Sequence, residues 1–186
     1  KYIGIIGFPI SAGVYFVAPQ VTDLIYGASF TGSVKTLQVL GLTVCILFIS
    51  NIIAYILTAA ERVNHVTHAN ASSVLVNIAL NFWFIPIWGG MGAALATLVC
   101  SIIKSAYIYL VFAMNFKDVI VLKNLAKPLL ATCFMSAVLW SFPSGLAATI
   151  LLGVISYGFF LIILRTFSRD EILMFRQMIP YPQVSR

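Results

Sequence analysis

The stretch VKTLQVLGLTVCILFISNIIAYILTAA, residues 34–60, decides the fold of this chain. It is apolar over most of its length, and its one charged side chain, Lys35, lies at its beginning. A helix needs about 20 predominantly apolar residues to cross a bilayer. A backbone in hydrocarbon must also satisfy its own hydrogen bonds, which a helix does. We therefore predict a membrane-spanning helix over about residues 34–60.

Similar apolar stretches lie on both sides of this one. They cover about residues 2–26, 70–87, 91–115, 128–142 and 146–164, with polar loops over 61–69 and 116–127. Over the whole chain 61% of the residues are hydrophobic and 9% are charged, whereas a soluble domain has roughly 25% charged residues. The composition therefore predicts an all-α membrane protein with six transmembrane helices.

The basic residues indicate how these six helices are oriented. Of the 11 Lys and Arg residues, Lys35 lies at one end of the spans and Lys104 lies inside a span. The others share the opposite end: Lys1, Arg62, Lys117, Lys123, Lys127, Arg165, Arg169, Arg176 and Arg186. Because such residues are retained in the cytoplasm during insertion, we expect a multi-pass protein of the cytoplasmic membrane with both ends of this segment inside the cell. This placement accounts for the net charge of +6 without nucleic acid as a partner.

A segment of a different kind follows the sixth span. Residues 168–179 alternate charged and apolar side chains at helical spacing, which predicts a short amphipathic helix on the inner leaflet, ended by Pro180. We divide the chain into a six-helix transmembrane part, residues 1–167, and a cytoplasmic amphipathic tail, residues 168–186. Since the chain begins with Lys1 rather than Met, we expect it to be part of a longer polypeptide.

Polar side chains form a stripe along each of two consecutive spans. The third span carries Asn70, Ser73, Asn77 and Asn81. The second span carries Asn51, Tyr55, Thr58 and Arg62. Residues three and four apart share one face of a helix, and polar groups in hydrocarbon need partners. Each stripe is therefore either a set of interhelical hydrogen bonds or a wall of an aqueous path or sugar-binding cavity, and both interpretations remain open.

The fourth span carries a lysine, Lys104, with Thr97 and Ser101 on the same face. Eleven residues, or about 16 Å of helix, separate it from Asn115 at the inner end of the span. A lysine stem reaches roughly 6 Å when it snorkels toward the headgroups, which does not cover that distance. Three interpretations stay open: a cavity cation that binds a phosphate or diphosphate, snorkelling in a thinned bilayer, and an ion pair with a carboxylate outside these spans.

The chain shows no pattern typical of an enzyme or of a cofactor site. His65 and His68 lack companions at metal-ligand spacing, and the three cysteines give neither a disulfide framework nor a metal motif. No catalytic constellation or nucleotide-binding glycine loop is present. We therefore expect no enzyme activity, no metal and no cofactor. Pro9 and Pro19 each remove a backbone hydrogen bond, so we expect bends in the first span.

Two blocks of sequence resemble the flippases of polysaccharide biosynthesis, a family within the multidrug/oligosaccharidyl-lipid/polysaccharide exporter superfamily. The first block contains Gly7-Phe8-Pro9, Ala18-Pro19 and Leu24-Ile25-Tyr26-Gly27. The second contains Asn77-Ile78-Ala79-Leu80-Asn81, Ile85-Pro86, Gly89 and Gly92-Ala93-Ala94-Leu95-Ala96-Thr97. The pairing of both blocks at this separation is more specific than either alone, and the resemblance extends from Tyr2 to about Ile179.

The resemblance implies the last six helices of a transporter with twelve to fourteen helices in two bundles around a central cavity. Such proteins move lipid-linked sugars across the cytoplasmic membrane by alternating access. The implied partners are a lipid-linked sugar, membrane lipid and the missing N-terminal helices of the same polypeptide. Lys104 would then meet the anionic head of the lipid carrier. A multidrug or metabolite exporter of the same superfamily and a membrane scaffold without transport activity are the alternatives.

Overall fold

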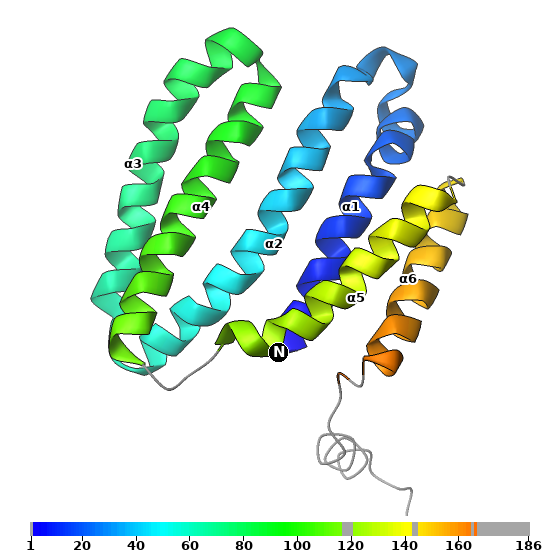
Figure 1. The fold of residues 1–186 in the computed structure, drawn as a ribbon. Coiled ribbons are helices and arrows are strands. Elements are labelled where there is room, and N and C mark those ends of the chain that lie inside the picture. The colour runs from blue at the N-terminus through cyan, green and yellow to red at the C-terminus, as the bar shows by residue number, and fades with distance from the viewer. Residues whose placement is uncertain (1, 117–120, 143–144, 165, 167–186) are drawn as a thin grey trace, which may run out of the picture.

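The computed structural model describes residues 2–116, 121–142, 145–164 and 166. Within these residues the chain forms six α-helices and one 3₁₀ turn and no strand (Figure 1). The elements are α1 (Tyr2–Tyr26), η1 (Ala28–Phe30), α2 (Gly32–Ala59), α3 (Val63–Trp88), α4 (Gly90–Asn115), α5 (Val121–Ser141) and α6 (Leu146–Ile163). The predicted all-α fold is confirmed.

Five of the described helices, α1, α2, α3, α4 and α6, are long and apolar enough to cross a membrane. The part of α5 that is described with its side chains, Leu125–Ser141, is apolar but shorter. The chain is therefore a multi-pass membrane protein. The amphipathic helix expected over residues 168–179 lies outside the described residues.

The helices run alternately up and down, as six consecutive spans require. At the end of the molecule where α1 begins, α2 and α4 end and α3 and α5 begin. At the opposite end α1, α3 and α5 end and α2, α4 and α6 begin (Figure 1). Neighbours in space are not always neighbours in the chain: α3 packs on α4, α4 on α2, and α2 on α1. In turn α1 packs on both α5 and α6, which also pack on each other. Two helices, α1 and α2, thus hold the most central positions.

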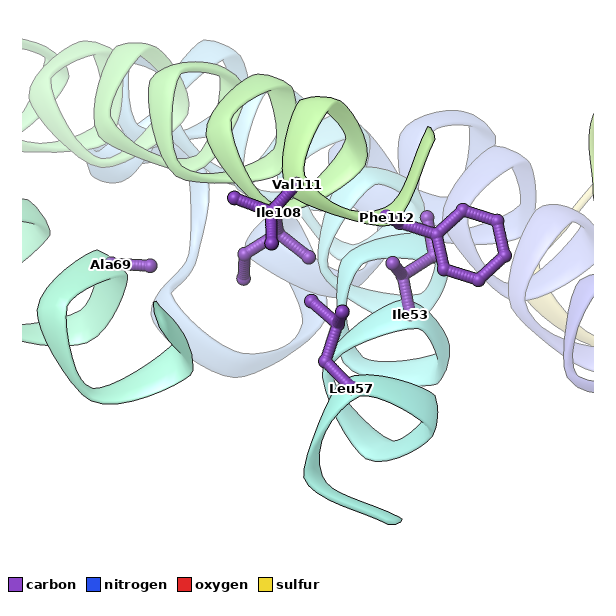
Figure 2. Packing of buried hydrophobic residues seen from close by; sticks show 6 residues of the cluster. All are labelled: Ile53, Leu57, Ala69, Ile108, Val111 and Phe112. Atoms are coloured by element: carbon purple, nitrogen blue, oxygen red, sulfur yellow. The ribbon is translucent and has the colours of Figure 1, made fainter. Parts of the chain in front are cut away.

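A buried apolar cluster joins α2, α3 and α4 near the end of the molecule where α1 begins. Figure 2 shows Ile53 and Leu57 of α2 beside Ile108, Val111 and Phe112 of α4. Ala69 of α3 lies at the edge of this cluster. A second cluster joins α5 to α6 and includes partly buried side chains of α1. Because lipid is as apolar as these side chains, close van der Waals packing rather than water exclusion stabilises both clusters.

The third helix begins seven residues earlier than the hydropathy indicates, at Val63 instead of about Asn70. The preceding helix ends in a Schellman motif, in which the N–H groups of Glu61 and Arg62 donate to the carbonyls of Thr58 (3.1 Å) and Leu57 (2.8 Å). Glu61 adopts the left-handed conformation that this motif needs, with φ 59°. The turn is therefore complete by Arg62, and the polar residues that were expected to form a loop belong to α3 instead. Hydropathy marks where a helix leaves the bilayer, and the backbone hydrogen bonds of the helix can continue beyond that point.

The fifth helix shows the same difference, since it begins at Val121 within the stretch expected to be a loop.

Both prolines of α1 lie inside a continuous helix, and neighbouring helices satisfy the carbonyls that they free. Pro9 cannot donate to the carbonyl of Ile5, four residues earlier. That carbonyl accepts a 2.8 Å hydrogen bond from the Tyr157 hydroxyl of α6. Pro19 frees the carbonyl of Tyr15 in the same way, and Gln38 Nε2 of α2 donates to it at 3.3 Å. Each proline thus creates an acceptor that ties another helix to α1; the bends themselves stay a prediction.

The α3–α4 hairpin depends on a close approach of its two backbones. Gly89 (φ 56°) is the one residue between the helices. One turn into the hairpin, a Cβ built on Gly92 would lie 2.2 Å from the carbonyl oxygen of Phe84. That oxygen belongs to the backbone and cannot move aside without distorting α3. Because Gly92 has only a hydrogen in place of a side chain, the C-terminal end of α3 can pack this closely on α4.

The substitution Gly92→Ala should lower the free energy of unfolding by about 1–3 kcal/mol, because the methyl group overpacks against a backbone carbonyl. Denaturant titration of the protein in detergent micelles measures this. Gly90→Ala is the matched control, since a Cβ at Gly90 meets nothing within 4 Å. Equal stability of the two variants would contradict the close packing at Gly92.

Removing the Tyr157 hydroxyl with Tyr157→Phe should cost about 0.5–2 kcal/mol of stability, because it leaves the Ile5 carbonyl unpaired in an apolar environment. The substitution Pro9→Ala restores an N–H that can donate to the same carbonyl. In the Pro9→Ala background the cost of Tyr157→Phe should therefore fall close to zero. A double-mutant cycle in micelles measures the coupling, and an equal cost in both backgrounds would argue against the bridge.

Candidate functional site

A small cavity lies between the first half of α3 and the middle of α4. Its volume is about 120 Å³. Five of its lining residues carry a polar or sulfur-containing side chain or a charge: Ser72, Ser73, Cys100, Lys104 and Tyr107. Its other walls are Ala69, Val76 and Ile103. The antiparallel pairing of the two helices brings these residues to one level.

Lys104 is the charged residue of this cavity. It lies near the centre of α4, with 14 residues to Gly90 and 11 to Asn115. It is about 21 Å of helix from one end and about 16 Å from the other. Its side chain is partly buried, and no ion pair joins it to an acidic group among the described residues. The structure therefore places a cation at mid-helix depth beside a cavity, the geometry in which an intramembrane charge needs a partner.

Hydroxyl groups accompany the ammonium group. The Tyr107 hydroxyl lies 3.3 Å from Nδ1 of His65 in the first turns of α3. Ser72 Oγ donates to the carbonyl of Ala69 at 3.2 Å. Tyr107 and Ser72 were not predicted as site residues. The position of Tyr107, three residues after Lys104, was a signal that could have found it, because residues three apart share one helix face.

The asparagines of α3 pair with each other. Asn81 Nδ2 donates to Asn77 Oδ1 at 2.8 Å, and both side chains are partly buried. The Oδ1 atom of Asn81 is buried without a hydrogen-bond partner in the described part of the chain. On α4, Thr97 Oγ1 donates to the carbonyl of Ala93 at 2.9 Å, and Ser101 is buried. None of these four candidates lines the cavity at Lys104, although Ser73, from the same predicted stripe, does.

The candidates on α2 point away from the packed side of that helix. Tyr55 is 73% exposed and Asn51 is exposed, whereas Ile53 and Leu57 are buried against α4. The structure therefore does not bring the stripe of α2 together with the α3–α4 cavity. Their face is free to meet lipid, solvent or other protein.

A second, larger cavity of about 610 Å³ lies where α1 meets α5 and α6. Pro9 lines it, as do the apolar side chains Ile10, Val14, Met135 and Leu139. Among the described residues that line it, Tyr157 and Thr149 carry the polar side chains. A space of this size and composition suits a hydrocarbon chain rather than a sugar.

The described residues contain no group of three or more His, Cys, Asp or Glu side chains that could hold a metal ion.

The exposure of α2 can be tested with two nearby substitutions. Tyr55→Ala should leave the free energy of unfolding within about 0.5 kcal/mol of the parent, because the side chain packs on little. Leu57→Ala should cost about 2 kcal/mol, near the low end for buried leucines, since lipid replaces only part of the lost packing. Denaturant titration in micelles measures both. A large loss with Tyr55→Ala would show that this face is packed.

Two comparisons place this chain among known proteins. The chain resembles the solved structure of the lipid II flippase MurJ in its inward closed conformation, with a TM-score of 0.74 and 23% identity, over 87% of this chain and 37% of that one. A curated relative from Klebsiella pneumoniae, described as an uncharacterized membrane protein in the cps region, is 27% identical over 134 residues. This match covers 72% of the chain and 25% of the relative. No family model matches the chain.

The chain thus spans about a quarter of the curated relative and little more than a third of the solved flippase. The helix arrangement predicted from the two motif blocks is confirmed at the level of the fold. The six described helices share the fold of part of the lipid II flippase MurJ.

Proposed function

We propose that this chain is the C-terminal part of a transporter that flips lipid-linked oligosaccharide or polysaccharide units across the cytoplasmic membrane by alternating access. The observation that carries the proposal is the shared fold with the lipid II flippase over 87% of the chain. The curated relative from a cps region is also a membrane protein, so this match supports a membrane transporter as well. Because the chain spans only part of both proteins, the complete transporter includes further helices.

The internal features of the chain fit such a substrate. A lipid-linked sugar combines a hydrocarbon tail, a phosphate-containing linker and a polar sugar. The apolar cavity between α1, α5 and α6 suits the tail. The partly buried asparagines of α3 and the exposed Asn51 and Tyr55 of α2 supply amide and hydroxyl groups for sugar contacts. These residues are candidates for the cavity wall once the remaining helices are present.

The orientation follows from the charge distribution. Arg62 and Lys127 lie toward the end of the molecule where α1 begins, and Lys35 lies at the other end. We place the first end, and with it both ends of this segment, in the cytoplasm. A transporter moves its substrate without a chemical step, and the sequence shows no pattern typical of an enzyme.

Flipping can be measured in proteoliposomes. They contain the protein purified from its own membrane, together with any chains that copurify with it. The probe is a fluorescent polyprenyl diphosphate oligosaccharide, and a membrane-impermeant reductant bleaches the fluorophores of the outer leaflet. Without flipping the bleaching stops near half of the signal. With the transporter it should continue beyond that level.

A phospholipid with the same fluorophore is the matched control and should remain half protected. Bleaching of both lipids to the same extent would indicate a general scramblase, and protection of both would contradict the proposed function.

A further inference from the structure

Three helices of this chain are longer than the hydrocarbon core of a bilayer. The helix α2 has 28 residues, and α3 and α4 have 26 each, which gives lengths of about 42 and 39 Å. The hydrocarbon core is about 30 Å thick. Tilt takes up part of the difference, and the rest of each helix extends beyond the core. The side chains near the helix ends indicate on which side this happens.

The tryptophans mark the boundary of the core on one side. Trp88 is the last residue of α3, Trp83 lies five residues before it, and Trp140 is the last residue but one of α5. All three tryptophans of the chain are exposed. Both helices end opposite the start of α1 (Figure 1). Because tryptophan favours the interface between lipid and water, this end of the helices lies at that interface, and the excess length lies at the other end.

Exposed tyrosines lie at a second level, nearer the end of the molecule where α1 begins. Tyr107 and Tyr109 of α4 are exposed and follow Gly90 by 17 and 19 residues, or about 26 and 29 Å of helix. The exposed Tyr55 of α2 lies at the same level, because the residues on either side of it pack against residues 108–112 of α4. The tryptophan and tyrosine levels are thus separated by about the thickness of the core.

The polarity of α3 changes at this second level. Its first seven residues, Val63–Ala69, include four polar side chains. One of them, His65, places its Nδ1 atom 3.3 Å from the Tyr107 hydroxyl. Beyond Tyr107, α4 continues for eight residues to Asn115, or about 12 Å. The start of α3 and the end of α4 therefore leave the hydrocarbon side by side.

We propose that the headgroup layers of the bilayer contact this chain at two belts, a tryptophan belt at one interface and a tyrosine belt at the other. The tryptophan belt consists of Trp83, Trp88 and Trp140, and the tyrosine belt consists of Tyr55, Tyr107 and Tyr109. Such rings place an apolar body against lipid and a polar tip in the headgroup layer. This placement does not depend on what the protein transports.

The belts assign a depth to Lys104. It precedes Tyr107 by three residues, or about 4.5 Å of helix, and a lysine stem reaches roughly 6 Å. Its ammonium group therefore reaches the water and headgroups at the tyrosine belt, and no intramembrane carboxylate is needed. The distance of about 16 Å to Asn115 does not measure depth, because the last two turns of α4 lie outside the hydrocarbon.

Spin labels on α4 test where the hydrocarbon ends. The complete polypeptide, with its native cysteines replaced by alanine, receives one cysteine at an exposed position and is placed in phospholipid vesicles: Ile102→Cys, Leu110→Cys or Met114→Cys. Collisions of the label with oxygen report hydrocarbon, and collisions with a water-soluble nickel chelate report water. Met114 lies seven residues beyond Tyr107, about 10 Å, so its label should collide mainly with nickel. The label at Ile102 should collide mainly with oxygen, and the label at Leu110 should be intermediate.

Ile78→Cys is the reference for these labels, because the exposed Ile78 lies ten residues before Trp88, about 15 Å and thus at half the core thickness. It should give the highest ratio of oxygen to nickel collisions. A label at Met114 that matches this reference would extend the hydrocarbon to the end of α4 and overturn the tyrosine belt. Equal nickel collisions at Ile102 and Met114 would overturn it as well.

Bilayers of increasing thickness test the depth of Lys104. As the acyl chains lengthen from palmitoleoyl to erucoyl, the interface moves away from Lys104 and its ammonium group loses contact with water. The thermal midpoint of the parent should therefore fall relative to that of Lys104→Met, which keeps an unbranched side chain and removes the charge. Lys104→Arg should behave like the parent. A constant difference between the parent and Lys104→Met at all thicknesses would show that the charge is compensated inside the protein and would overturn the assigned depth.

Discussion

The constraint on which the structure depends is that every backbone polar group in hydrocarbon needs a partner. In α1, Pro9 and Pro19 each leave a carbonyl without its helical donor. Tyr157 of α6 and Gln38 of α2 supply the missing donors. The requirement created by two prolines is thus met only when α1 lies between α2 and α6, which is the position that it occupies. Packing that would otherwise be unspecific among apolar helices gains a defined register from these two bonds.

The same constraint separates two regions of the molecule. The α1 side, with α5 and α6, encloses an apolar cavity in which few polar groups need partners. The α4 side, with α3, gathers a lysine and several hydroxyls around a small cavity where hydrogen bonds are available. The two regions therefore differ in the number of polar side chains that need partners.

Much of the fold follows from hydropathy alone. The chain energetically prefers to place each long apolar run across the bilayer as a helix, so the order and approximate positions of six helices can be predicted, and α1 begins and ends where the sequence indicates. Hydropathy does not mark where a helix ends in water, which is why α3 begins at Val63 rather than near Asn70. The candidate site was predicted in part: Lys104 was identified, whereas Ser72 and Tyr107 were not.

The sequence by itself determined the class of the protein, its helices and the presence of a cation inside a span. Only the tertiary structure decided which faces meet. The two polar stripes lie on consecutive helices, yet α3 packs chiefly on α4, and Tyr55 remains exposed on α2. Tyr157 and Ile5 meet although 152 residues separate them. Insertion depends on the polarity of each run, which the sequence displays, whereas the choice of neighbour depends on the fit of side chains in three dimensions, which no linear pattern contains.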